Sequence, residues 1–257
     1  MLNIDLLEQI ELKYNKNISE VKYEDENIIV FFNKTAPTMY DYNFIYVKKE
    51  LNLDELQNLI YQEKVDAINS ERNYLKICFK INSNLPQNIH EYCKELSGEC
   101  DKIAFMTIDK SKIYDWKKYD NIKVILIKDS ESLNKFIELN YQEDLKISKQ
   151  YADNRRNLIL NQYNNKNFQL YSAYYNENVV GTAEVFLSNK MAKIENVFVG
   201  EPYRNKGACT ELLRKIINDY SEDIYLTTDI NDEPINLYKK LNFNVISNQI
   251  NTLYLFK

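Results

Sequence analysis

Residues 194–213 read IENVFVGEPYRNKGACTELL, and this stretch is the most informative part of the sequence about the fold. Its first half is an apolar run that ends at Val199 and predicts a buried β-strand. A short turn and a basic loop, residues 204–207, follow the strand. From Gly207 onward apolar side chains recur at helical spacing, which predicts a helix over 207–220. The stretch is therefore typical of a strand–loop–helix connection in an α/β protein.

The predicted start of this helix has the properties of an anion site. The first turn of a helix presents backbone N–H groups without partners and about half a positive charge from the aligned peptide dipoles. Gly207, which has no Cβ, allows a phosphate to come close to the backbone, and Arg204 and Lys206 add positive charge at the rim. The pattern predicts a diphosphate site. The alternative is that Gly207 only begins a helix and the two cations are solvated.

Composition narrows the function classes. The chain has 257 residues, of which 4 are glycine, and a net charge of −5, whereas glycine usage is typically roughly 7%. So few glycines exclude collagen-like and Gly-rich linker segments, a P-loop and a dinucleotide-binding G-x-G-x-x-G. The acidic balance argues against a nucleic-acid-binding surface. The glycines stand at Gly98, Gly181, Gly200 and Gly207.

The cysteines and the N-terminal residues bear on the compartment and on metals. The four cysteines include no C-x-x-C pair, and His90 is the single histidine, so neither a zinc site nor a disulfide framework is expected. No apolar run approaches the roughly 20 residues of a membrane helix, and residues 1–5 do not resemble a signal peptide. We therefore expect a cytoplasmic protein without a metal or a membrane partner.

Strand and helix patterns alternate along the chain and restart after a polar stretch at 109–120. We predict two domains, residues 1–117 and residues 118–257, both of α/β (α+β) class. The predicted strands cover 27–33, 43–48, 74–81, 102–107, 124–127, 168–174, 179–187, 191–199, 224–228, 244–246 and 252–256. The predicted helices cover 1–16, a segment capped by Asp54, a segment opened by Pro86, 129–139, 145–162, 207–220 and 233–241.

Two motifs in the second half resemble a known family. Residues 204–209, RNKGAC, resemble the Q/R-x-x-G-x-G/A pyrophosphate loop of the GNAT N-acetyltransferase superfamily. Asn231, followed by Tyr238 and by 241–243, resembles that family's N…LY-x-K-x-G-F segment. The resemblance covers about residues 122–257. It implies a mixed, mostly antiparallel, twisted sheet flanked by helices. The first half resembles a degenerate copy in a tandem GNAT arrangement; an unrelated accessory domain is the alternative.

The resemblance also implies roles for particular residues. Tyr238 would protonate the thiolate that leaves, Asn231 would contact the cofactor near its pantetheine arm, and an N–H of Val199 or Phe198 would stabilise the oxyanion. The implied acetyl-CoA-binding residues are Val197, Phe198, Val199, Arg204, Asn205, Lys206, Gly207, Ala208, Cys209, Thr210 and Asn231.

The sequence departs from the family pattern at three positions. Cys209 stands where the family prefers Gly or Ala, and its side chain either faces the core or crowds the loop. Asn242 replaces a glycine, and asparagine tolerates the left-handed conformation. Leu226 stands where some members carry an acidic residue. Glu195 is then the first candidate general base, on a parity argument that places it with Val197 and Val199, and Asp229 is the second; a water relay could replace both.

The sequence therefore predicts an acetyl-CoA-dependent N-acetyltransferase in which a primary amine attacks the thioester directly. The acceptor is a small-molecule or peptide amine, and the chain is expected to be a monomer or a homodimer that binds no nucleic acid. A non-catalytic acyl-CoA-binding or interaction module is the alternative.

Overall fold

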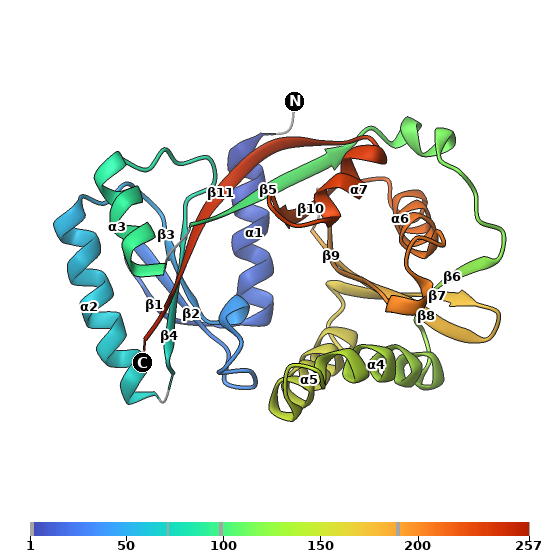
Figure 1. Cartoon of the computed structure of the whole chain (residues 1–257), viewed down its shortest axis with the longest axis horizontal. Coiled ribbons are helices and arrows are strands. Elements are labelled where there is room, and N and C mark those ends of the chain that lie inside the picture. The colour runs from blue at the N-terminus through green and yellow to red at the C-terminus, as the bar shows by residue number, and fades with distance from the viewer. Residues whose placement is uncertain (1–2, 71, 98–99, 189–190, 257) are drawn as a thin grey trace. The chain divides into compact units, whose positions relative to one another are not determined.

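The computed structural model describes residues 3–70, 72–97, 100–188 and 191–256 (Figure 1). Gly98 lies outside the described residues. Two compact units emerge from the contacts within the chain. The first unit comprises Met1–Phe105, Thr228–Asp232 and Ile246–Lys257, and the second comprises Met106–Thr227 and Glu233–Val245. Each unit takes residues from both sides of position 118, and the domain boundary placed there stays a prediction.

The first unit is a mixed sheet with helices on both faces. Its strand order is β1-β2-β3-β4-β11. The β3–β4 pair is parallel, and the β1–β2, β2–β3 and β4–β11 pairs are antiparallel. The elements are α1 (Ile4–Ile18), β1 (Glu20–Glu24), β2 (Ile28–Phe32), η1 (Tyr40–Tyr42), β3 (Phe44–Val47), α2 (Leu53–Asn69), β4 (Tyr74–Phe79), α3 (Gln87–Ser97), β5 (Asp101–Ile108) and β11 (Phe243–Leu255).

Strand β2 is apolar throughout because both of its faces are covered. Val30 packs in one cluster with Leu56 of α2 and Cys93 of α3. Phe31 packs in another, beside Leu12 of α1. Side chains alternate between the faces of a strand, so a strand buried on both faces reads as a continuous apolar run.

The second unit repeats this arrangement. Its strand order is β10-β9-β8-β7-β6, the β9–β10 pair is parallel, and the β6–β7, β7–β8 and β8–β9 pairs are antiparallel. The elements are η2 (Lys110–Asp115), β6 (Ile122–Leu126), α4 (Ser130–Asp144), α5 (Lys149–Tyr163), β7 (Phe168–Tyr175), β8 (Asn178–Leu187), β9 (Met191–Val199), η3 (Glu201–Tyr203), α6 (Ala208–Asp219), β10 (Asp223–Asp229) and α7 (Pro234–Lys240).

Strand β8 carries contacts to helices on both sides of the sheet. The backbone of Gly181 faces Leu212 of α6 so closely that a Cβ there would lie 3.3 Å from the Leu212 Cδ1 atom and 2.9 Å from the Phe198 carbonyl oxygen. On the opposite face Glu184, 1% exposed, forms an ion pair with Arg155 of α5, which is 6% exposed. The glycine lets α6 lie against the sheet, and the ion pair anchors α5.

The structure confirms most of the predicted elements and corrects several ends. Strand β1 was missed because all of its residues are exposed and it has no buried face. Helix α2 is capped by Asn52 instead of Asp54. Helix α4 continues to Asp144, and α5 begins only after Ser148, its N-cap. The two strands predicted at 244–246 and 252–256 are one strand, β11.

The buried ion pair yields a stability prediction. Glu184→Ala removes the carboxylate that forms the buried ion pair with the Arg155 guanidinium, and the free energy of unfolding should fall by about 3–5 kcal/mol. Glu131→Ala removes the partner of Lys135, whose ion pair is exposed, and should cost about 0.5 kcal/mol or less. Urea unfolding followed by circular dichroism measures both. Equal effects of the two substitutions would contradict a structural role for the buried pair.

Candidate functional site

Strands β9 and β10 separate before either of them ends. They pair from Asp223↔Met191 to Leu226↔Ile194, yet β9 runs on to Val199 and β10 to Asp229. Over this stretch β9 remains paired on its other side, with β8, as far as Gly181↔Val199. The backbone edge of residues 197–199 that faces β10 therefore has no strand partner there, and it offers N–H and C=O groups to an extended ligand that carries amides.

A β-bulge lies where the strands separate. Thr182 pairs with Phe198 and Glu184 with Glu195, so β9 has one residue more than β8 over this interval. Asn196, in the bulge, has a φ of 50°, and its Nδ2 donates to the Glu184 Oε2 at 2.9 Å. Bulges change the direction of the side chains that follow, and the Glu184 carboxylate fixes this one.

The bulge overturns the parity argument for Glu195. Directly opposed residues of an antiparallel pair share a face of the sheet, and Glu195 lies opposite Glu184, whose side chain contacts α5. Glu195 therefore shares a face with Phe198 instead of Val197 and Val199. Its Oε1 atom lies 2.6 Å from the Lys193 Nζ and accepts from the Thr227 hydroxyl at 3.4 Å.

Helix α6 begins without a side-chain cap. Gly207 is the N-cap residue and has a left-handed φ of 93°. The first backbone hydrogen bond of the helix runs from the Glu211 N–H to the Gly207 carbonyl at 3.0 Å. The N–H groups of residues 208–210 precede it and have no carbonyl partner within the helix. They form a donor cluster at the positive end of the helix dipole.

The structure gives a reason for glycine at position 207 in addition to the phosphate approach predicted from the sequence. A Cβ on Gly207 would overlap the ring of Tyr119, which covers this side of the backbone. The left-handed φ independently disfavours any other residue. The glycine accommodates a packed aromatic ring, and the N–H groups of the helix start remain available beside it.

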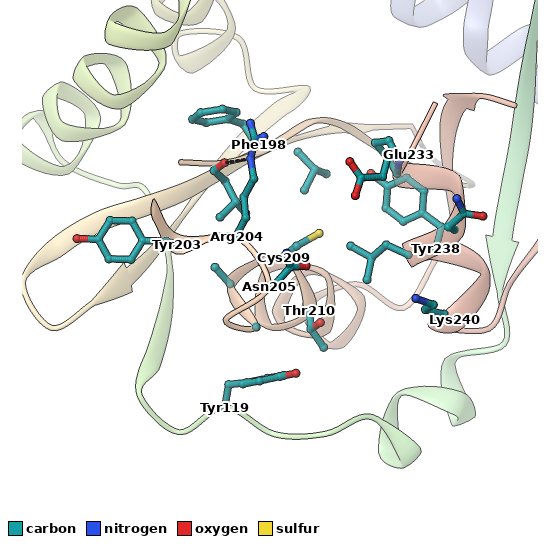
Figure 2. Close-up of a pocket in the computed structure, with 17 residues that line it drawn as sticks. Tyr119, Phe198, Tyr203, Arg204, Asn205, Cys209, Thr210, Glu233, Tyr238 and Lys240 are labelled. Carbon is teal, nitrogen blue, oxygen red and sulfur yellow. Dashed lines mark hydrogen bonds between the residues drawn. The ribbon is translucent and has the colours of Figure 1, made fainter. Parts of the chain in front are cut away.

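A cavity of about 590 Å³ joins these features (Figure 2). Of the eleven predicted acetyl-CoA-binding residues, nine line it: Val197, Phe198, Val199, Arg204, Asn205, Gly207, Ala208, Cys209 and Thr210. Tyr238, the predicted acid, lines it as well. The lining residues that the sequence analysis did not name for this site are Tyr119, Tyr203, Glu233, Pro234, Asn236, Leu237 and Lys240.

Three predicted residues lie outside the cavity lining. Lys206 is exposed, and its Nζ lies 5.7 Å from the centre of the Tyr203 ring. Asn231 is exposed on the turn after β10, where its N–H donates to the Asp229 Oδ1 at 2.7 Å. Glu195, the third, lies on the same face of β9 as Phe198 because of the bulge. Their functional assignments stay predictions.

Two ionisable groups of the cavity, Tyr238 and Cys209, are held in their neutral forms. Burial raises the pKa of the Tyr238 hydroxyl well above its usual range, and Cys209 and the Glu195 charge raise it further. Burial raises the pKa of the Cys209 thiol to about 12. At neutral pH Tyr238 is therefore a proton donor, and Cys209, whose sulfur is drawn inside the cavity in Figure 2, is a thiol instead of a thiolate.

The departure at Asn242 behaves as expected. Its φ is 64°, which is the left-handed conformation that glycine would adopt, and asparagine tolerates it. Within the described residues no helix is long and apolar enough to cross a membrane. No group of three or more His, Cys, Asp or Glu side chains among those residues could hold a metal ion.

Comparison with known proteins bears on the family of the part of the chain that carries the cavity. Residues 133–243 match the acetyltransferase (GNAT) family. This part of the chain is a GNAT acetyltransferase domain. No curated protein matches the sequence of the chain.

Solved structures similar to the whole chain include tandem proteins. One is a functionally unknown conserved protein from Staphylococcus epidermidis (18% identity, 93% of this chain and 95% of that chain, TM-score 0.81). Another is a GCN5-related N-acetyltransferase from Kribbella flavida (8% identity, 99% of this chain and 96% of that chain, TM-score 0.67). A third is a tandem GNAT protein from the clavulanic acid biosynthesis pathway (11% identity, 89% of this chain and 78% of that chain, TM-score 0.55). At these identities the likeness concerns the fold, and it confirms the predicted tandem GNAT class.

The glycine at the helix start yields a prediction with a matched control. Gly207→Ala should weaken coenzyme A binding at least about tenfold, because the new Cβ overlaps Tyr119 and the left-handed backbone costs roughly 1–2 kcal/mol. A Cβ on Gly200 would make ordinary contacts, the nearest at 3.7 Å from the Leu139 Cδ1, so Gly200→Ala should bind as the parent does. Titration calorimetry with coenzyme A measures both variants. Unchanged binding by Gly207→Ala would mean that the helix start is not the anion site.

Proposed function

We propose that the protein is an acetyl-CoA-dependent N-acetyltransferase in which a primary amine attacks the thioester directly in a ternary complex. The observation that carries the proposal is the single cavity that joins the unpaired backbone edge of β9, the uncapped start of α6 and the buried hydroxyl of Tyr238. These are an amide-pairing edge, an anion site and a proton donor. Binding of an acyl-CoA uses the first two, and transfer of its acyl group uses the third.

The residues of the cavity fit acetyl-CoA in sequence along its length. The N–H groups of residues 208–210 would hold the pyrophosphate, with Arg204 and Lys206 as neighbouring cations. The backbone of residues 197–199 would pair with the two amides of the pantetheine arm. Asn231 would contact that arm as well. The cofactor supplies an acetyl group activated as a thioester, and the proposal involves no metal.

The protein groups then have distinct roles in acyl transfer. A backbone N–H of Phe198 or Val199 donates to the carbonyl oxygen as negative charge develops there. The Tyr238 hydroxyl donates its proton to the departing sulfur, which leaves more readily as a thiol. Glu195, directly or through water, accepts the proton that the attacking amine loses. The acceptor is a small-molecule or peptide amine, and we expect a cytoplasmic monomer or homodimer.

One observation favours the alternative, an acyl-CoA-binding module without turnover. The Glu195 carboxylate is engaged by the Lys193 ammonium at 2.6 Å, and an ion-paired carboxylate is a weaker base than a solvated one. A binding module needs the cavity but no base. The following substitutions separate the two functions.

Tyr238→Phe tests the proton donor. The variant keeps the ring and its packing against Phe243, at 5.8 Å between centroids, and loses only the hydroxyl. We expect kcat to fall about 100-fold or more with the dissociation constant of coenzyme A unchanged. Because the pKa of Tyr238 is raised, its hydroxyl stays protonated as pH rises to 9, and the parent enzyme should show no loss of kcat from this group in that range. Thiol release across a panel of amines measures the rate.

Turnover by the parent with an unaffected Tyr238→Phe variant would remove Tyr238 from the mechanism. Coenzyme A binding without thiol release on any amine of a broad panel would favour the binding module.

Glu195→Gln tests the general base against Asp229→Asn. If Glu195 accepts the amine proton, its loss should lower kcat/KM about 100-fold and flatten the acidic limb of the pH–rate profile. Asp229→Asn should leave both the rate and the profile as in the parent. The reverse pattern would move the assignment to Asp229, and two unaffected variants would favour a water relay.

A further inference from the structure

We propose that Tyr119 is the residue that recognises the nucleotide half of the acyl-CoA, its 3′-phosphorylated adenosine. The inference rests on the proposed function, since it assigns one end of the same ligand to one end of the same cavity. Tyr119 belongs to neither GNAT motif of the sequence. It lies between η2 and β6, outside residues 133–243 that match the family.

Tyr119 is set apart from the rest of the cavity lining. The other lining residues come from 197–210 and from 233–240. Tyr119 approaches the start of α6 from a different segment, and its ring packs on Gly207 at the point where the helix N–H groups are exposed. In Figure 2 the Tyr119 ring lies beneath the first turn of α6, below Thr210, and Phe198 lies above that turn. The ring is half-buried and therefore keeps a surface for a ligand.

A polar clasp holds Tyr119 in this place. The Tyr119 N–H donates to the Glu211 Oε1 at 3.1 Å. The second oxygen of that carboxylate accepts from the Arg214 Nε at 3.1 Å. The Arg214 guanidinium also donates to the carbonyl oxygens of Ile113 at 2.6 Å and Lys117 at 2.8 Å.

Arg214 also holds the backbone of the residues that precede Tyr119. Arg214 makes a further hydrogen bond to the Trp116 carbonyl at 3.2 Å and lies 5.5 Å from the centre of the Trp116 ring. Its side chain is 13% exposed, and that of Glu211 is 14% exposed. The guanidinium is a planar group with donors in a fixed arrangement, so these hydrogen bonds hold the Arg214 side chain in one orientation. Glu211 and Arg214 both belong to α6. The helix that carries the anion site therefore also supports Tyr119.

The order of groups along the cavity assigns the nucleotide to Tyr119. The thioester end of the ligand belongs with Tyr238 and the pantetheine arm with residues 197–199, while the pyrophosphate belongs at the α6 start. The adenosine is joined to the far side of the pyrophosphate. Tyr119 is the aromatic side chain that packs on Gly207 at that start, and a purine binds an aromatic ring by stacking.

Charges near Tyr119 suit a nucleotide that carries a 3′-phosphate. The Lys117 Nζ lies 5.0 Å from the centre of the Tyr119 ring, and Lys117 is exposed. Lys240 also lines the cavity. Glu233 is the acidic residue of the lining, and it stands in Figure 2 on the side of Phe198 and Tyr238. Lys117 is therefore the cation that lies directly beside the Tyr119 ring.

The test compares coenzyme A with its two halves, adenosine 3′,5′-bisphosphate and 4′-phosphopantetheine, by titration calorimetry. Tyr119→Ala should bind coenzyme A and adenosine 3′,5′-bisphosphate about tenfold more weakly than the parent. Its binding of 4′-phosphopantetheine should change less than about twofold. Tyr119→Phe keeps the ring and should bind all three as the parent does. Tyr114→Ala removes a tyrosine of the same segment that is 80% exposed and should have no effect.

The outcomes separate this inference from the proposed function. No binding of coenzyme A by the parent would overturn the proposed function. Normal binding of coenzyme A by Tyr119→Ala would overturn the role of Tyr119 and leave the proposed function intact. Equal weakening of both halves would also overturn it, because Tyr119 would then only support the helix start.

The positioning role of Arg214 has its own test. Arg214→Gln removes the clasp, and if it acts through Tyr119 it should weaken adenosine 3′,5′-bisphosphate binding by no more than Tyr119→Ala does. The double variant should then bind as Tyr119→Ala alone, since the two changes remove one interaction. Additive effects of the two substitutions would overturn the coupling, and thermal unfolding of each variant identifies a loss of binding that comes from a loss of fold.

Discussion

The separation of β9 from β10 after Ile194 is the constraint on which the rest of the site depends. Two parallel strands that stayed paired to their ends would satisfy each other's backbone groups. Here the pairing stops at Leu226↔Ile194, and the bulge at Asn196 turns the free part of β9. The Glu184 carboxylate, held by Arg155, fixes the bulge. A buried ion pair beneath the sheet thus fixes a backbone edge that has no strand partner, and on this edge the Val199 carbonyl accepts from the Arg204 Nε at 3.3 Å.

The first unit shows what the same topology becomes without this separation. Its parallel pair, β3 and β4, is joined to the last residue of both strands, Val47↔Phe79. The helix that follows β3 begins with a capping box, in which the Asn52 side chain accepts from the Glu55 N–H and the Glu55 carboxylate accepts from the Asn52 N–H. That carboxylate occupies the anion position of the helix start. The cavity at these strand ends is about 210 Å³, too small for a nucleotide. In the first unit, therefore, the two strands stay paired to their ends and the helix start is capped by the chain's own side chains.

Sequence reasoning reached the parts of the site that are local in the chain. The strand end, loop and helix start at 197–210 carry their signal in residue order, and the nine lining residues among those expected all lie in this stretch. Parity failed for Glu195 because one extra residue in β9 exchanges the faces of the strand, and nothing in the sequence marks a bulge. Tyr119 was missed because contacts distant along the chain hold it at the site: Glu211 is 92 residues from Tyr119, and Arg214 is 97 residues from Lys117. Strand β1 was missed because it has no buried face.

Helix α6 couples stability to ligand binding. Leu212 packs beneath Gly181 of the sheet, Glu211 and Arg214 fasten the segment before β6, and the first turn leaves its N–H groups without a cap. A glycine N-cap costs roughly a few tenths of a kcal/mol relative to a capping asparagine. An anion at that start supplies the missing acceptors, and a ligand that binds only the folded chain adds RT ln(1 + [L]/Kd) to its stability. Under the proposed function, the acyl-CoA would complete a helix start at which Gly207 stands in the N-cap position that Asn52 takes in α2.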